Sequence, residues 1–125
     1  MRKIISTDKA PEAVGPYSQA ISVNGLLFVS GQIPLSPETG ELVSADIKVQ
    51  TRQVLENLKA IVESAGYDIG KIVKCSCFLK NMDDFNAFNE IYSEYFISSL
   101  PARECVEVSR LPKNVKVEIS AICGI

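Results

Sequence analysis

The stretch Leu100-Pro101-Ala102-Arg103-Glu104-Cys105-Val106-Glu107-Val108 places an arginine inside a segment that otherwise has the pattern of a half-buried β-strand. Pro101 fixes its own φ and disfavours helix at the residue before it, so that a strand can begin directly afterwards. Because side chains alternate along a strand, Arg103 shares one face with Cys105 and Glu107. A buried guanidinium without a partner is costly, so Arg103 needs an acid of the chain or of a ligand.

Two helical patterns precede this strand. Apolar residues recur at every third or fourth position from Ile47 to Ala65, which predicts an amphipathic helix with Ser44 or Asp46 as N-cap and Gly66 after its end. A second stripe predicts a helix that begins at an Asp83 cap, with aromatic residues more typical of a core than of a cofactor site. The residues of this second stripe are Phe85, Phe88, Ile91, Tyr92, Tyr95 and Phe96.

Four other segments have strand patterns. The turn Asn24-Gly25 between Ala20–Val23 and Leu26–Ile33 is a strong hairpin signal. Apolar strands are expected at Ile72–Lys80 and, alternating, at Val115–Cys123. The order β-β-α-β-α-β-β predicts an α+β fold in which a mixed β-sheet carries two helices packed on one face.

The strand expected at Ile72–Lys80 has apolar residues on both of its faces. One face carries Val73, Cys75, Cys77 and Leu79, and the other carries Ile72 and Phe78. Since two helices on one side leave the other side open, self-association is expected to cover it. The alternative is a solvated face formed by Lys74, Ser76 and Lys80.

Composition limits the class of protein. The chain of 125 residues is 46% apolar and 22% charged, which is typical of one soluble domain spanning residues 1–125, and no apolar stretch is long enough for a membrane span. The net charge of −2 argues against a protein that binds nucleic acid through its phosphates. The segment Met1–Asp8 lacks the apolar core of a secretory signal, so a cytoplasmic location is expected.

The chain has no histidine and four cysteines. Without histidine, neither a Ser-His-Asp nor a Cys-His relay can form, and zinc sites lose their imidazole ligands. Cys75 and Cys77 point to one face of a strand and, with Cys105 and Cys123, are expected to be free thiols that pack as small apolar groups. No metal and no organic cofactor is expected.

Four motifs, in this order, resemble the Rid (RidA, YjgF) family of reactive-intermediate deaminases, and the resemblance extends from Thr7 to Ala121. They are Gly15-Pro16-Tyr17-Ser18-Gln19, Val29-Ser30-Gly31-Gln32-Ile33-Pro34, the strand with Arg103, and Leu111-Pro112-Lys113-Asn114-Val115-Lys116-Val117-Glu118-Ile119. The resemblance implies a chorismate-mutase-like fold assembled as a homotrimer with ligand sites between subunits. It also implies hydrolysis of 2-iminobutanoate and 2-iminopropanoate to 2-oxo acids and ammonia.

The resemblance assigns roles to seven residues. Arg103 would bind the substrate carboxylate, and Cys105 and Glu118 would lie beside the attacking water. The remaining residues that would line the cleft are Tyr17, Ser30, Gly31 and Asn89. Residue chemistry agrees, because a guanidinium binds a carboxylate through two bonds and a glutamate can take a proton from water.

Each role has a structural alternative. Arg103 could form an ion pair with Glu104, Glu107 or Glu118, and Glu118 could be a solvated strand carboxylate. The neighbouring cation could lower the pKa of the Cys105 thiol, although packing is its expected role without a base beside it.

Two other functions remain open. One is a non-catalytic trimer that binds 2-oxo acids in a regulatory or chaperone-like role. The other is cleavage of RNA, which the acidic balance and the missing histidine disfavour. The expected partners are therefore small 2-imino and 2-oxo acids and further copies of the chain, without nucleic acid or membrane.

Overall fold

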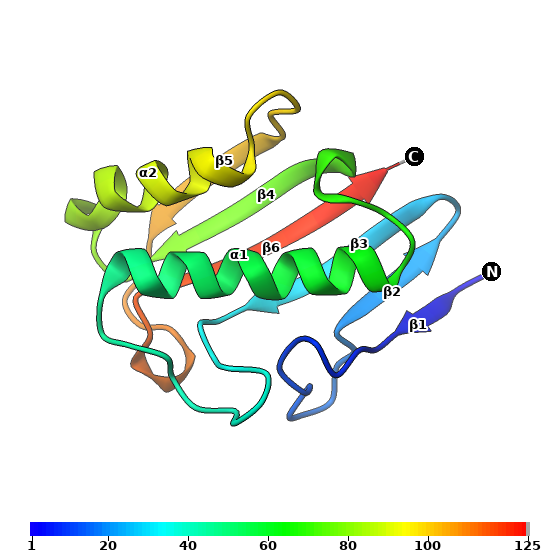
Figure 1. Cartoon of the computed structure of the whole chain (residues 1–125), viewed down its shortest axis with the longest axis horizontal. Coiled ribbons are helices and arrows are strands. Elements are labelled where there is room, and N and C mark those ends of the chain that lie inside the picture. Colours follow the sequence, from blue (N-terminus) through cyan, green and yellow to red (C-terminus); the bar gives the residue numbers. More distant parts are fainter. Residues whose placement is uncertain (125) are drawn as a thin grey trace.

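The chain forms a six-stranded mixed sheet, and both of its helices lie against one face of that sheet (Figure 1). The structure is a computed structural model that describes residues 1–124. Its elements are β1 (Lys3–Ile5), β2 (Ala20–Val23), β3 (Leu26–Gln32), α1 (Ile47–Ser64), β4 (Ile72–Leu79), α2 (Phe85–Tyr95), β5 (Ala102–Glu107) and β6 (Val117–Gly124). The strands lie in the order β1-β2-β3-β6-β4-β5, and the β4–β5 pair is parallel while the others are antiparallel. The expected α+β class is confirmed.

Two short features at the ends of elements differ from the sequence-based expectation. The sequence pattern does not predict β1, because three residues are too few to show an alternation. Asp83 is not the N-cap of α2, since it lies in a 3₁₀ turn before the helix and its N–H donates to the Asn81 side chain at 2.9 Å. Asn81 therefore starts this segment, and its short amide side chain suits that position.

Strand β4 contains an irregularity that changes which side chains share a face. Ile72 and Lys74 lie opposite consecutive residues of β6, so Val73 is an extra residue. Ile72 is buried and Val73 is 50% exposed, which corrects the expectation that Val73 shares a face with Cys75.

Helix α1 begins and ends as its capping residues predict. The Asp46 carboxylate accepts a hydrogen bond from the Val49 N–H at 3.0 Å, so Asp46 rather than Ser44 is the N-cap. Gly66, directly after the helix, has a φ of +87°, which glycine adopts without strain. The fully buried apolar stripe against the sheet is Val54, Leu55, Leu58, Ile61 and Val62.

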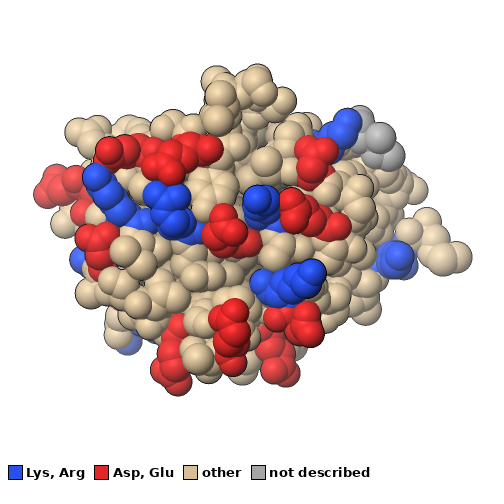
Figure 2. Space-filling model, viewed as in Figure 1, with Lys and Arg blue, Asp and Glu red and all other residues tan. Residues whose placement is uncertain are grey.

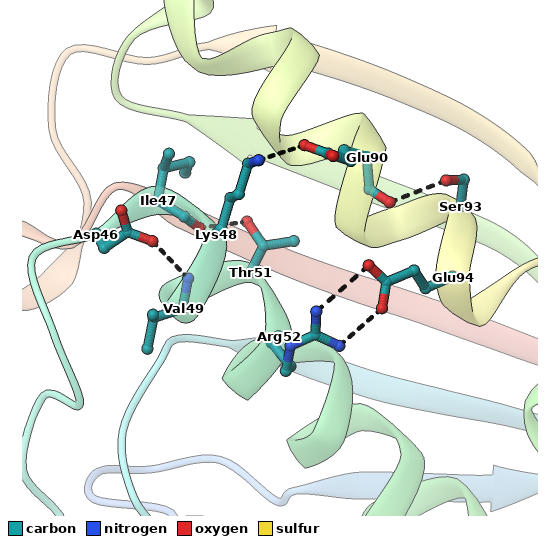
Figure 3. Close-up of polar contacts among 9 residues, drawn as sticks. All are labelled: Asp46, Ile47, Lys48, Val49, Thr51, Arg52, Glu90, Ser93 and Glu94. Atoms are coloured by element: carbon teal, nitrogen blue, oxygen red, sulfur yellow. Dashed lines mark hydrogen bonds and ion pairs between the residues drawn. The ribbon is translucent and has the colours of Figure 1, made fainter.

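Two ion pairs join the outer faces of α1 and α2 (Figure 3). Lys48 pairs with Glu90, and the two terminal nitrogens of Arg52 donate to the Glu94 carboxylate at 2.9 and 3.3 Å. Exposed ion pairs contribute little to stability, so the buried stripes supply most of the attachment between the helices and the sheet. The pairs link the exposed faces of the two helices, away from the side of α2 that faces Arg103.

The other face of the sheet has no covering layer within residues 1–124. Large apolar side chains alternate there with the buried ones, and the exposed fractions of Phe28 and Val106 are 42% and 44%. Polar side chains such as Lys74 and Ser76 share this face. The expectation of an uncovered, partly apolar face is confirmed.

Neither α1 nor α2, the two α-helices of the described chain, is both long and apolar enough to cross a membrane.

Candidate functional site

Arg103 extends from the edge strand β5 toward α2, on the face of the sheet that the helices cover. Its guanidinium carbon lies 4.7 Å from the centroid of the Tyr92 ring, 5.6 Å from that of Phe85 and 5.8 Å from that of Phe88. Its Nη1 donates a hydrogen bond to Asn89 Oδ1 at 2.8 Å. Arg103 is therefore held by three aromatic rings and one amide.

None of the internal acids considered for Arg103 forms an ion pair with it. Within residues 1–124 no carboxylate oxygen lies within 4.0 Å of its guanidinium nitrogens. Glu104 instead pairs with Lys74 at 2.9 Å, and Glu107 accepts a hydrogen bond from the Met82 N–H at 2.7 Å. The alternative of a structural ion pair for Arg103 is therefore wrong for Glu104, Glu107 and Glu118 alike.

Cys105 shares the face of Arg103 and lies opposite Cys77 of β4. Burial raises the pKa of the Cys105 thiol, and the charge of Arg103 only partly opposes this. The cation therefore lowers the pKa in the expected direction, but burial outweighs it, and the net rise favours a packing role over a nucleophilic one. All four cysteines are free thiols.

Glu118 lies on the opposite, uncovered face of the sheet. It alternates with the buried Val117 and Ile119, as the sequence predicts, and lies opposite Phe78 of β4. Its carboxylate is half-buried, and burial raises the pKa of Glu118 above its ordinary value. A carboxylate with a raised pKa is a stronger base, which suits a group that takes a proton from water.

A β-bulge in β3 sets the position of Ser30 and Gly31, because these two residues face a single residue of β6. The Glu118 side chain fills the space beside Gly31 that the side chain of any larger residue at position 31 would need. A Cβ at this position would lie 2.9 Å from Glu118 Cδ. The Ser30 hydroxyl donates to the Ser18 carbonyl at 2.6 Å and so ties the loop of Tyr17 to β3. Tyr17 is 52% exposed and lines one surface hollow with Ser30 and another with Gly31.

The structure brings the seven candidate residues together as two groups rather than one. The guanidinium half-site, on the helical side at the edge of the sheet, comprises Arg103, Asn89 and Cys105. The carboxylate half-site, on the uncovered side, comprises Tyr17, Ser30, Gly31 and Glu118. Across the sheet, Glu118 on β6 is two strand spacings, roughly 10 Å, from β5, and Ser30 and Gly31 on β3 are three spacings, roughly 14 Å, from it. The two groups also lie on opposite faces. A four-carbon acid cannot contact both groups in one chain.

Sequence reasoning missed the aromatic part of the guanidinium half-site. The residues Phe85, Phe88 and Tyr92 were expected to be core, and they are also the rings that surround Arg103. Their spacing of three and four residues places them on one helical face with Asn89. This shared face was the sequence signal that they could lie beside the same ligand-binding side chain. Within the described chain, no three His, Cys, Asp or Glu side chains lie close enough together to bind a metal ion.

Replacing Gly31 with alanine tests the contact with Glu118. The added methyl would overlap the carboxyl group, which we expect to swing away because it ends a flexible side chain. We expect kcat for the reaction of this site to fall at least about tenfold with little change in melting temperature. The control is Gly70→Ala, whose Cβ would lie 3.0 Å from the Asp68 carboxylate and within 4 Å of no residue of either half-site. Equal activity of the two variants would show that the position of Glu118 is unimportant.

The chain is similar to proteins of one family over nearly all of its length. The family model described as "Endoribonuclease L-PSP" matches residues 7–125. A RutC family protein of Pyrococcus horikoshii is 57% identical over 122 residues, which cover 98% of this chain and 97% of that protein. The 2-iminobutanoate/2-iminopropanoate deaminase of Escherichia coli is 50% identical over 125 residues, which cover 98% and 97% of the two chains.

Solved structures agree with this similarity. The Rid-family protein YyfA of Yersinia pestis, described as of unknown function, has a TM-score of 0.97 at 50% identity and covers 100% of both chains. TdcF of Escherichia coli, solved with bound serine, has a TM-score of 0.94 at 47% identity and covers 98% of both chains. Family model, sequences and folds coincide, and the chain belongs to the endoribonuclease L-PSP family, also known as the YjgF/Rid family.

Proposed function

We propose that the chain is a cytoplasmic imine deaminase that hydrolyses 2-iminobutanoate and 2-iminopropanoate to 2-oxo acids and ammonia, without a metal or organic cofactor. The observation that supports this most directly is the Arg103 guanidinium, which has no acid partner within residues 1–124. The substrate class comes from the Escherichia coli deaminase, which is 50% identical to this chain.

The two half-sites divide the chemistry between them. Arg103 binds the substrate carboxylate through parallel N–H bonds, which fixes the position of the neighbouring C2 atom. Once the imine nitrogen is protonated, C2 is an electrophile, and Glu118 takes a proton from the water that adds to it. The same proton then passes to the nitrogen of the adduct. The C–N bond breaks and ammonia leaves while Glu118 takes the proton of the adduct's hydroxyl group, so that this oxygen becomes the carbonyl of the 2-oxo acid. Glu118 then gives this proton to ammonia or water and is ionised again.

Completion of the site requires more than one chain, because its two halves lie on opposite faces of the sheet. We place the guanidinium half-site of one chain against the carboxylate half-site of a neighbour in a closed homotrimer. Repeating one such contact around a threefold axis makes three equivalent sites and leaves no free half. The uncovered apolar face, with Phe28 and Val106, supplies contact area for this assembly.

The proposal is tested by generating 2-iminobutanoate with a threonine dehydratase and following its disappearance and the release of ammonia. We expect the chain to accelerate both, and to sediment with the mass of three chains of 13.7 kDa. A rate equal to that of the buffer alone would contradict catalysis. A monomer with full activity would contradict the shared site.

A non-catalytic carboxylate-binding role is the second candidate, favoured by TdcF, a relative solved with serine bound. It predicts that 2-oxobutanoate binds and that Arg103→Ala abolishes binding, while imine decays no faster than in buffer. The rate measurement therefore separates this role from catalysis.

Cleavage of RNA, which the family description names, has no support from the charges of the helical face. Basic side chains there lie among acidic ones (Figure 2), and the net charge of the chain is −2. Binding through phosphates needs a basic surface and weakens steeply with salt. Salt-sensitive RNA binding by the assembled protein would revive this candidate.

A further inference from the structure

The Arg103 guanidinium lies in an aromatic cradle, which we define as the rings of Phe85, Phe88 and Tyr92. All three ring centroids lie within 6 Å of the guanidinium carbon, the range in which a cation is attracted to the face of a ring. A carboxylate partner would neutralise the charge and compete with a ligand acid. Aromatic rings attract the cation without neutralising it, so the guanidinium stays available for an anion.

We propose that Tyr92 is a positioning residue whose ring holds the Arg103 guanidinium in the orientation that binds the substrate carboxylate. This inference rests on the proposed function of Arg103. Tyr92 is the closest ring of the cradle, at 4.7 Å, and its side chain is only 7% exposed. A side chain that is held in its binding orientation in advance loses less conformational freedom when the ligand arrives, which strengthens binding.

The Tyr92 ring is itself fixed by its neighbours. Its centroid lies 5.6 Å from that of Phe88 and 4.5 Å from that of Phe96, in tilted arrangements on successive turns at the end of α2. Asn89, three residues before Tyr92 on the same helix, accepts the hydrogen bond from Arg103 Nη1 at 2.8 Å. A ring and an amide from one rigid helix therefore constrain the guanidinium from two directions.

The ring of Tyr92, rather than its hydroxyl, carries this role. The hydroxyl oxygen is buried and has no hydrogen-bond partner within residues 1–124. Burial, with the Cys75 thiol as a further cause, raises the pKa of Tyr92, so the hydroxyl stays protonated at neutral pH and offers no charge to Arg103. Phenylalanine at this position keeps the ring and should therefore keep the effect.

The test compares Tyr92→Leu, Tyr92→Phe and Ile91→Ala in the full chain. Isothermal titration with 2-oxobutanoate measures affinity, and imine hydrolysis separates KM from kcat. We expect Tyr92→Leu to weaken binding about tenfold and to raise KM more than it lowers kcat, since a cation–π contact of this kind is worth about that factor. We expect Tyr92→Phe to restore the wild-type affinity. Ile91→Ala removes a buried side chain of the same helix that is not part of the cradle, and it should lower stability without weakening binding.

A second measurement needs no ligand. The ring current of an aromatic residue shifts nearby resonances, so we expect the Arg103 Nε–H proton to move downfield in Tyr92→Leu and to stay in place in Tyr92→Phe. If Tyr92→Leu does not assemble, Tyr92→Met removes the ring with less change in volume and takes its place.

The outcomes distinguish this inference from the proposed function. Unchanged affinity in Tyr92→Leu, or an equal loss in Ile91→Ala, would overturn the positioning role. An unshifted Arg103 resonance in Tyr92→Leu would do the same. If wild-type protein and Arg103→Ala bind 2-oxobutanoate equally, the proposed function of Arg103 fails, and the resonance alone then decides whether Tyr92 orients it.

Discussion

Arg103→Ala is expected to lower kcat/KM for 2-iminobutanoate on the order of 100-fold or more. Hydrogen bonds to a charged group contribute about 1.5–3 kcal/mol, and the loss is larger where water is excluded. Arg103→Lys is expected to lose nearly as much, because an ammonium cannot form the two parallel bonds of a guanidinium. The measurement is imine loss under dehydratase supply, with the mass of the assembly checked for each variant.

The matched control is Arg52→Ala, which removes the same charge from the outer face of α1, where Arg52 pairs with Glu94. Activity should stay within about twofold of wild type, since an exposed pair contributes little. Stability gives a second readout. A structural ion pair at Arg103 would cost about 3–5 kcal/mol when broken, whereas a guanidinium without an acid partner should cost clearly less when removed. Arg103 variants that keep their rate and lose their stability would reverse our assignment.

The local features of the guanidinium half-site could be predicted because they depend on neighbouring residues. Alternation along β5 places Arg103 and Cys105 on one face, and the structure confirms it. Helical spacing likewise places Phe85, Asn89 and Tyr92 on one stripe. What this spacing could not show is that the stripe meets β5, because contacts between elements depend on the order of the strands.

The division of the site between two faces follows from non-local pairing. Sequence order does not show that β6 lies between β3 and β4, and this insertion places Glu118 beside Gly31 and away from Arg103. The bulge at Ser30 and Gly31 is a similar case. A glycine inside a strand is a known signal for a bulge, but its effect on register depends on the partner strand. The extra residue Val73 in β4 reversed an expected face for the same reason.

Glu118→Gln is expected to lower kcat for imine hydrolysis on the order of 100-fold or more, which is the usual contribution of a general base. The amide has nearly the same shape but cannot take a proton, so 2-oxobutanoate should still bind within a few-fold of wild type. The control is Glu63→Gln, an exposed position of α1 remote from both half-sites, which should leave kcat unchanged. Unchanged turnover in Glu118→Gln would remove this carboxylate from the mechanism.

The raised pKa of Glu118 adds two pH-dependent results with opposite directions. The base works only when ionised, so wild-type kcat should fall as pH decreases through the raised pKa, above the range in which an ordinary glutamate titrates.

The free energy of unfolding should depend on pH in the opposite direction and increase as pH decreases. Burial makes the folded state hold this proton more tightly than the unfolded state, so ionisation destabilises the fold at neutral pH and not at pH values below the unfolded pKa. Glu118→Gln should therefore be more stable than wild type at neutral pH, and this advantage should disappear on acidification. A variant that loses both turnover and neutral-pH stability would indicate a structural carboxylate instead of a base kept partly buried for catalysis.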